Sequence, residues 1–310
     1  MFGKRTVVDM INRSSENDAD RRNFLRSAGI AGLGVVGAGA LSTMEATSAA
    51  ATTAAPSDGA VLNFALNLEY LEAEFYSRAV YGWGLPDGLT TGKGQRGGVV
   101  GGRKVKFTSK AIRSYAREIA GDEVDHVIFL RNALGNAKVA RPRIDLKSSF
   151  TAAARAAGLI GPGQTFDPYD NENNFLLAAF LFEDVGVTAY KGAAPLIKNK
   201  TYLEAAAGIL AVEAYHAGVV RNNLYQKGLQ DPVKAISDAR DSLDGKSDLD
   251  QGIGNSRRAN LVPTDRNGLA FSRSTGQVLN VVYLTPKKVT KGGFFPNGVN
   301  GAINTSGNNG

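Results

Sequence analysis

Apolar side chains recur at helical spacing in four long stretches of the chain. The first stretch follows Ser57 and runs to about Tyr81, where Gly82 ends the pattern. Its apolar face contains Leu62, Ala65, Leu66, Ala73, Tyr76 and Val80. The other three run from Thr108 to about Leu134, from just after Asp170 to about Lys191, and from Thr201 to about Lys227. Because Thr108 and the Thr201-x-x-Glu204 capping box are typical of helix starts, the pattern predicts four helices of about 20–27 residues, each ~30–40 Å long.

The segments between these stretches are rich in glycine and proline. Residues 82–107 are too dense in glycine for a helix and are expected to form a loop or a small hairpin. Residues 136–171 form a long connection with three prolines and a short apolar segment at 150–160. A more polar fifth helix is expected at 232–243, and beyond Asp250 the chain is expected to be mostly loop, apart from an apolar segment at 277–284. The pattern therefore predicts an all-α fold, with a four-helix bundle at 58–228, a long crossover connection and a loop-rich, basic extension at 229–310.

The first fifty residues have the organisation of a targeting segment. Arg21 and Arg22 precede a Phe-Leu pair and a weakly apolar Gly/Ala run, and small residues suited to signal peptidase follow. This arrangement resembles a twin-arginine export signal. A transmembrane anchor is the alternative, but the glycines make the run weakly hydrophobic. We therefore expect export by the twin-arginine machinery, cleavage within 48–55, and a periplasmic or extracellular protein.

Composition restricts the chemistry that the chain can support. It contains no cysteine, which excludes disulfides, thiolate metal sites, iron–sulfur clusters and a catalytic thiol. The formal net charge is +7, and the basic residues after Asp250 are scattered through Gly/Asn-rich loops. Nucleic-acid binding is not expected, because such binding favours basic residues interleaved with aromatic ones on one element. These basic residues are expected to form a solvated surface.

Both histidines of the chain follow a glutamate by three positions. The pairs are Glu123 with His126 on the second predicted helix and Glu213 with His216 on the fourth. Residues three apart share a helix face, so each pair can direct a carboxylate and an imidazole at one point. One such pair is usually a solvated helix pair, but two pairs that use every histidine predict a shared site.

The first and third predicted helices each carry a glutamate within an apolar face. Glu69 is followed seven residues later by Tyr76, and Glu183 is followed at the same distance by Tyr190. The four helices thus repeat a Glu-x6-Tyr helix followed by a Glu-x-x-His helix, which indicates an internal duplication. Four buried carboxylates would repel one another, and two divalent cations would neutralise them. Oxygen and nitrogen donors without sulfur favour two Fe or Mn ions, with zinc a common contaminant on isolation.

This pattern resembles the ferritin-like di-iron/di-manganese carboxylate superfamily over about residues 58–228. The stretch 64–76, the twin-arginine signal and the tail from Asn280 resemble a bacterial branch related to plant desiccation-associated proteins. The resemblance implies a ferritin-like four-helix bundle in which Glu69 and Glu183 are single-glutamate ligands. It also implies that the paired motifs supply the remaining ligands, with the two glutamates bridging: Glu123, His126, Glu213 and His216.

Several neighbouring residues are candidates for other roles. Glu72, one turn from Glu69, is either a ligand or an extra carboxylate, whereas Glu74 is expected to be solvated. Asp122 is a candidate to orient a ligating imidazole, as an aspartate does in related enzymes, but Val212 fills the equivalent place on the fourth helix. The other candidate catalytic residues, Tyr76 and Tyr190, are either core tyrosines or donors to a ligand carboxylate.

Three functions fit these residues. The first is a redox di-metal protein that oxidises Fe(II) or disposes of peroxide, with Fe(II), oxygen or peroxide as small-molecule substrates, in stress and desiccation protection. The second is a structural or surface-associated stress protein in which the metals hold the bundle together without turnover. The third is a substrate oxygenase, which needs an apolar channel. A homo-oligomer is compatible with the sequence, but a 24-subunit cage is not expected, because residues 136–171 and the long tail would obstruct its packing.

Overall fold

The computed structural model describes residues 55–309. The export signal predicted within residues 1–50 lies outside the described residues. The described chain is mostly helical, and the prediction of an all-α bundle is confirmed.

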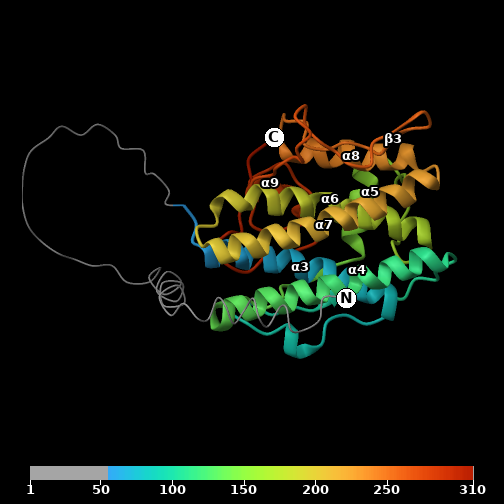
Figure 1. Ribbon diagram of the computed structural model, residues 1–310. Helices are drawn as coiled ribbons and strands as arrows, with labels where there is room; N and C mark the ends of the chain where they lie inside the picture. The colour runs from blue at the N-terminus through green and yellow to red at the C-terminus, as the bar shows by residue number, and fades with distance from the viewer. Residues whose placement is uncertain (1–54, 310) are drawn as a thin grey trace, which may run out of the picture.

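Four long helices form the bundle: α3 (Asp58–Tyr81), α4 (Lys110–Leu134), α6 (Glu172–Ala193) and α7 (Lys200–Gln226). The helix α3 packs along α4, α6 packs along α7, and the two pairs lie against each other (Figure 1). α3 and α6 are buried on nearly all sides, which explains their high content of Leu, Ala and Phe. The duplicated sequence pattern therefore corresponds to two helix pairs whose inner faces meet at the centre of the bundle.

Two predicted helix starts are wrong by one or two residues. α4 is capped by Ser109, whose hydroxyl accepts from the Ile112 amide, and not by Thr108. α7 begins at Lys200 because the Asn199 side chain accepts from the amides of Thr201 and Tyr202. Thr201 therefore lies inside the first turn and does not form the expected capping box. Asparagine and serine are both favourable N-caps, so a neighbouring polar residue took the place of the expected one.

The connections between the long helices are more ordered than expected. The glycine-rich loop after α3 contains the 3-10 turn η2 (Asp87–Leu89) and the short strand β1 (Val99–Val100). This strand pairs in parallel with β2 (Ile144–Asp145) in the crossover connection, so the loop does not form a hairpin with itself. After the turn η3 (Gly135–Ala137), the crossover also contains α5 (Ser148–Ala156), whose Phe150 contacts Phe75 of α3.

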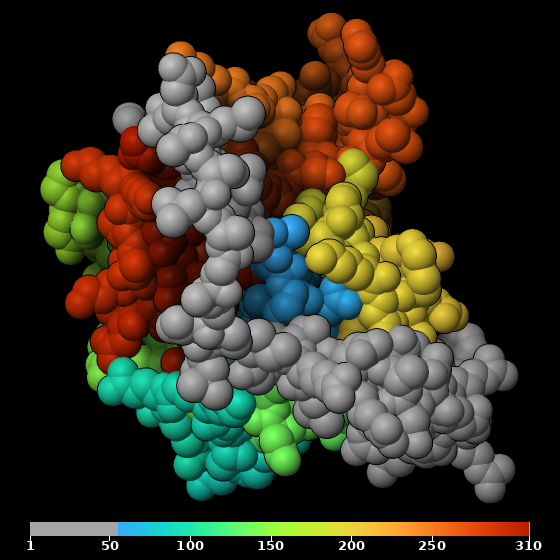
Figure 2. Space-filling view, turned by 90° about the vertical axis from the view of Figure 1, so that its left-hand side faces the viewer, coloured from blue at the N-terminus to red at the C-terminus, as the bar shows by residue number. Residues whose placement is uncertain are grey.

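The C-terminal extension covers the bundle instead of projecting from it. The turn η4 (Ala194–Leu196) links α6 to α7, and the chain continues through α8 (Gln230–Asp244), the antiparallel strands β3 (Gly254–Asn255) and β4 (Arg258–Ala259), and α9 (Thr275–Tyr283). α9 packs against α6 and α8, and Phe294 and Phe295 of the tail are buried. Figure 2 shows the start of α3, in blue, between C-terminal residues in red and the junction of α6 and α7 in yellow.

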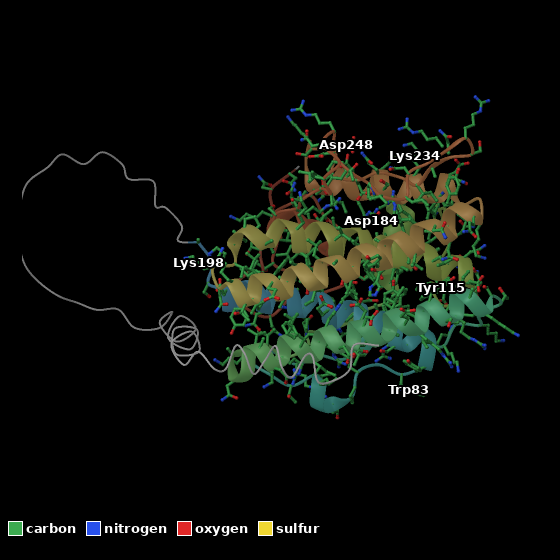
Figure 3. All side chains as sticks on the ribbon, viewed as in Figure 1. Trp83, Tyr115, Asp184, Lys198, Lys234 and Asp248 are labelled. Atoms are coloured by element: carbon green, nitrogen blue, oxygen red, sulfur yellow. The ribbon has the colours of Figure 1, made fainter. Side chains whose placement is uncertain are left out.

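One basic residue after Asp250 departs from the predicted solvated surface. Arg273 is buried and donates to Asp244 at 2.6 Å and to Asp250 at 2.8 Å. Arg240 of α8 connects this cluster to Asp184 of α6 at 3.0 Å. Figure 3 shows Asp184 inside the molecule, whereas Lys234 and Asp248 lie at its outer edge. The other basic residues after Asp250 are exposed, as predicted: Arg257, Arg258, Arg266, Lys287, Lys288 and Lys291.

Candidate metal centre

The six predicted ligands converge at the middle of the bundle. Their donor atoms form two groups, and the atoms of each group lie within 4.8 Å of one another. The first group is Glu69, Glu123, His126 and Glu213, and the second is Glu123, Glu183, Glu213 and His216. All six side chains are buried. Because Glu123 and Glu213 belong to both groups, they lie where bridging carboxylates would be needed.

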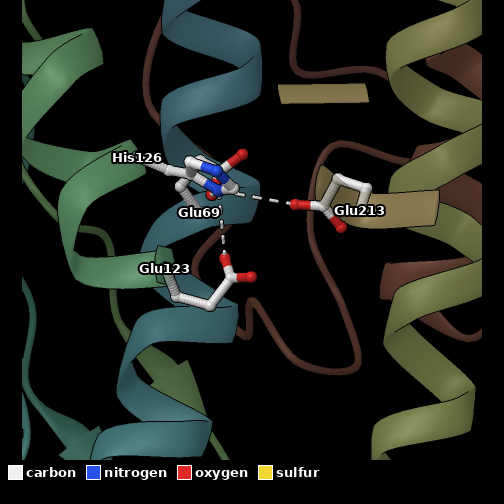
Figure 4. Close-up of side chains that lie close together, drawn as sticks. All are labelled: Glu69, Glu123, His126 and Glu213. Carbon is white, nitrogen blue, oxygen red and sulfur yellow. Dashed lines mark hydrogen bonds and ion pairs between the residues drawn. The ribbon is translucent and has the colours of Figure 1, made fainter. Parts of the chain in front are cut away.

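The first group surrounds the imidazole of His126. Its Nδ1 atom lies 3.2 Å from Oε2 of Glu69, 3.7 Å from Oε2 of Glu123 and 3.6 Å from Oε1 of Glu213. Figure 4 shows Glu123 and Glu213 approaching this ring from two directions. The carboxylates come from α3, α4 and α7, so three helices fix the position of this group.

The second group surrounds His216 and has one additional contact. Its Nδ1 atom lies 3.1 Å from Oε1 of Glu123 and 3.6 Å from Oε2 of Glu183. Its Nε2 atom lies 3.0 Å from Oδ2 of Asp122, the residue expected to orient an imidazole. Val212 occupies the corresponding position before Glu213 and has no carboxylate, so the two halves differ as the sequence indicated.

The two tyrosines cross between the helix pairs. Tyr76 of α3 donates its hydroxyl hydrogen bond to Glu183 of α6, and Tyr190 of α6 donates to Glu69 of α3. Burial, together with the carboxylates nearby, raises the pKa of both hydroxyls well above the usual value. Both hydroxyls therefore stay protonated and act as donors to the two single glutamates.

Glu72 lies at the edge of the cluster and belongs to neither group. It is buried, and its Oε2 atom has no hydrogen-bond partner among the described residues. A Cβ atom at Gly186 would lie 3.6 Å from Oε1 of Glu72 and 2.4 Å from Oε2 of Glu213. The glycine therefore provides the space in α6 that these two carboxylates occupy.

The expectation that Glu74 is solvated is wrong. Glu74 is fully buried and forms ion pairs with Arg141, from the crossover connection, and with Arg78 at 2.9 Å. The Leu85 amide also donates to this carboxylate. Glu74 therefore joins α3 to two connections and takes no part in the central cluster.

The carboxylates of the cluster have strongly perturbed acidity. Burial raises the pKa of Glu69 to about 7, although His126 opposes the shift, and burial raises the pKa of Glu183 to about 8 against the effect of His216. Burial and the neighbouring carboxylates also raise the pKa of Glu72 and Glu213 well above their usual range. In the absence of cations, this cluster is too crowded with negative charge to be fully ionised.

The two imidazoles and the carboxylate of Glu123 are instead stabilised in their charged forms. Burial alone would lower the pKa of His216, but Glu183, Asp122 and Glu123 raise it to about 10. The pKa of His126 is likewise raised, because Glu69 and Glu123 outweigh its burial. Burial would raise the pKa of Glu123, but its contacts with both imidazoles hold that pKa well below the usual value. Protons on the imidazoles thus take the place that cations would occupy.

The donor atoms left without partners fit a pair of metal ions. Seven buried atoms in this region form no hydrogen bond among the described residues: Glu72 Oε2, Glu123 Oε1 and Oε2, Glu183 Oε2, Glu213 Oε1 and Oε2, and His216 Nδ1. Five of them lie 3.1–3.7 Å from an imidazole or carboxylate atom of the cluster, whereas Glu72 Oε2 and Glu213 Oε2 have no such contact in the described part of the chain. Unpartnered buried polar atoms are rare and costly. Oxygen and imidazole donors suit iron or manganese, and two divalent cations would balance the four glutamates of the two groups.

Two features of the site region were not found from the sequence. The burial of Glu74 depends on Arg141, which lies 67 positions away, and local spacing gives no indication of that pair. The role of Gly186 did have a local signal, because a glycine inside a long apolar helix is unfavourable unless close packing requires it.

Comparison with known proteins identifies the family. Residues 57–226, more than half of the chain, match the family model of the ferritin-like domain. A desiccation-related protein, PCC13-62, from Craterostigma plantagineum is 29% identical over 262 residues, which cover 77% of this chain and 82% of that protein. The ferritin-like catalase Nec2 from Nesocodon mauritianus is 28% identical over 269 residues, which cover 80% of this chain and 85% of that protein. No solved structure matches significantly. The chain belongs to the ferritin-like family.

Proposed function

We propose that this chain holds two iron or manganese ions in its central cluster and uses them to consume hydrogen peroxide. The observation that carries the proposal is the pair of overlapping donor groups, which share Glu123 and Glu213. Similarity to a protein named a ferritin-like catalase supports the choice of reaction. Similarity to a desiccation-related protein supports a role in stress protection.

The residues divide naturally between two ions. Glu69 and His126 would hold one ion, Glu183 and His216 would hold the other, and the two shared glutamates would contact both. When bound, two such ions can each change by one electron, which matches the two-electron chemistry of peroxide. In the overall reaction, one peroxide gives up two electrons and two protons to form dioxygen, and a second accepts them to form two waters.

The surrounding side chains hold the donors in position. Tyr76 donates to one oxygen of Glu183, and Tyr190 donates to one oxygen of Glu69. These hydrogen bonds orient the two carboxylates across the bundle. Asp122 accepts from Nε2 of His216, which leaves Nδ1 of that ring facing the cluster. Four glutamates and two imidazoles give each ion about three or four protein donors, fewer than the six of an octahedral site, so positions remain for a small substrate.

A peroxide-consumption assay tests this proposal. Protein loaded with manganese should break down peroxide faster than the same concentration of free manganese. Glu69→Gln should abolish the excess rate, because it removes one charge from the donor set at nearly constant volume. Glu204→Gln, on the exposed face of α7, is the matched control and should retain the rate. Equal rates for wild type, Glu69→Gln and free metal would instead favour metals that only stabilise the fold.

Export is the second part of the proposal. The arginine pair in the first fifty residues supports delivery by the twin-arginine route to the periplasm or beyond. Changing Arg21 and Arg22 to lysine should retain the precursor in the cytoplasm, as cell fractionation would show. Undiminished export of this variant would exclude the twin-arginine route.

A further inference from the structure

Two apolar cavities lie in series between the C-terminal extension and the metal centre. The outer cavity has a volume of about 40 Å³ and lies between α5, α6, α8 and α9. The inner cavity has a volume of about 10 Å³ and lies between α3, α6, α9 and Phe294. Leu181 of α6 and Val281 of α9 line both cavities, so two apolar side chains form the wall between them.

The outer cavity lies next to the protein surface, and the inner cavity lies next to the carboxylate cluster. The outer cavity reaches the surface beside Ala156, which is exposed, and beside Leu243 and Leu284, which are partly exposed. The inner cavity ends at Glu72 and Gly186. Because Gly186 has no side chain, the carboxylates of Glu72 and Glu213 occupy the space beside it, next to this end of the cavity.

The walls of the two cavities favour an uncharged, apolar molecule. The lining is almost entirely aliphatic and aromatic, and its two charged members are Arg240 and Glu72. Arg240 is already paired with Asp184 and Asp250, so its charge is not free to hold an ion. An ion would lose its hydration in such a passage, and peroxide would lose its hydrogen bonds to water, whereas dioxygen has neither to lose. A volume of about 10 Å³ is at the lower limit for one water-sized molecule.

The polar side of the cluster lies at α4 and α7, away from both cavities. No residue of α4 or α7 lines either cavity, yet these helices carry both histidines. On their side, Asp122 contacts His216 and has a side chain that is 42% exposed. On the side of α4 and α7, the partly exposed carboxylate of Asp122 therefore links the cluster to solvent through its contact with His216.

We propose that dioxygen crosses this protein through the two apolar cavities, past Leu181 and Val281, to the carboxylate cluster. The proposal rests on the proposed function in one respect, because it takes the cluster to be where dioxygen is formed or consumed. Dioxygen is the product when peroxide is broken down. It is also the oxidant of an iron-loaded form, in which two Fe(II) ions give two electrons and dioxygen takes up two protons to leave as hydrogen peroxide.

The passage can be tested in metal-free protein with dioxygen itself as the probe. Dioxygen is paramagnetic and speeds the NMR relaxation of methyl groups that it approaches. In the presence of dissolved oxygen, the methyl groups of Leu181 and Val281 should relax several-fold faster than those of Val127 and Leu134, which are at least as deeply buried and line neither cavity. Equal relaxation of all four residues would overturn the proposal.

Filling the outer cavity provides the second test. Ala153 of α5 lines that cavity, whereas its neighbour Ala152 is exposed, so Ala153→Phe and Ala152→Phe form a matched pair. Ala157→Phe, at the partly exposed edge of the cavity, serves if Ala153→Phe does not fold. The cavity-filling variant should lose the dioxygen effect at Val281, and its iron-loaded form should be oxidised by dioxygen several-fold more slowly than Ala152→Phe.

The two proposals fail in different ways. Manganese-loaded wild type that leaves peroxide intact would remove the proposed function, while relaxation in metal-free protein still decides whether dioxygen enters. The converse result is a protein that consumes peroxide while dioxygen oxidises the iron-loaded cavity-filling variant as fast as it oxidises Ala152→Phe. That result would preserve the proposed function and overturn the passage.

Discussion

Asp122 makes the two halves of the metal centre unequal at the level of single residues. It contacts Nε2 of His216, and Val212 provides no corresponding group near His126. Its position beside the cluster was predictable, because it directly precedes Glu123 on a helix whose apolar residues recur at clear helical spacing. The partner of Glu74 was not predictable, because Arg141 approaches through tertiary structure.

Removing the Asp122 charge should weaken one metal position more than the other. Asp122→Asn should lower the affinity for one of two ions by about 10–100-fold, the usual effect of losing a carboxylate that orients a ligating histidine. A metal titration followed by calorimetry would resolve the two binding steps. Asp125→Asn, on the exposed face of the same helix, should leave both steps unchanged. A uniform loss at both positions would show that Asp122 does not act through His216.

Gly186 should be required for metal binding although it is not a ligand. A Cβ atom there would lie 2.4 Å from Oε2 of Glu213, so Gly186→Ala should displace that carboxylate and lower the metal content. Gly208 lies in α7 with open space around it, and Gly208→Ala should stabilise the protein by about 0.5–1 kcal/mol through helix propensity. Elemental analysis and urea unfolding of the two variants check these outcomes. Full metal occupancy in Gly186→Ala would contradict the packing argument.

At the scale of elements, the long helices were predictable and their exact starts were not. Apolar periodicity over some twenty residues determines that α3, α4, α6 and α7 exist, but the first turn depends on which nearby polar side chain caps it. The observed cap Ser109 directly follows Thr108, and the observed cap Asn199 lies two positions before Thr201; Thr108 and Thr201 were the predicted caps. The helix α9 is nine residues long and was predicted only as an apolar segment, because its burial against α6 and α8 decides its conformation.

The buried ion pairs of Arg273 should hold the C-terminal extension to the bundle. Arg273→Ala would leave Asp244 without its ion-pair partner in the interior and Asp250 with Arg240 alone, and it should destabilise the protein by about 3–5 kcal/mol. Urea unfolding of metal-free protein is the appropriate measurement. Arg266→Ala, at an exposed position of the same extension, should change stability by less than about 0.5 kcal/mol. Similar losses for both variants would show that the buried pairs are not what attaches the extension.

At the scale of the whole molecule, the central cluster should make stability depend on pH and metal together. Burial raises the pKa of Glu69 to about 7 and that of Glu183 to about 8 in metal-free protein. Their contribution to stability is fully present below the ordinary glutamate pKa and is lost as the pH rises through 7 and 8. Glu183, Asp122 and Glu123 outweigh the effect of burial on His216 and raise its pKa to about 10, so its contribution is lost at still higher pH.

Metal-free protein should therefore unfold more easily at pH 9 than at pH 6. Metal ions compete with the same protons, so the stabilisation given by metal should grow across this range. Thermal unfolding with and without manganese, at several pH values, measures both effects. A metal-dependent stabilisation that shrinks as the pH rises would contradict the assignment of these groups as ligands.

The metal content of the purified protein tests the site most directly. Elemental analysis of wild type, beside the double variant His126→Ala/His216→Ala, counts the ions that each folded chain retains. Two iron or manganese ions per wild-type chain, with most of that metal lost in the double variant, is the predicted result. A stably folded wild type without metal, or a double variant with undiminished content, would contradict a metal centre built from these residues.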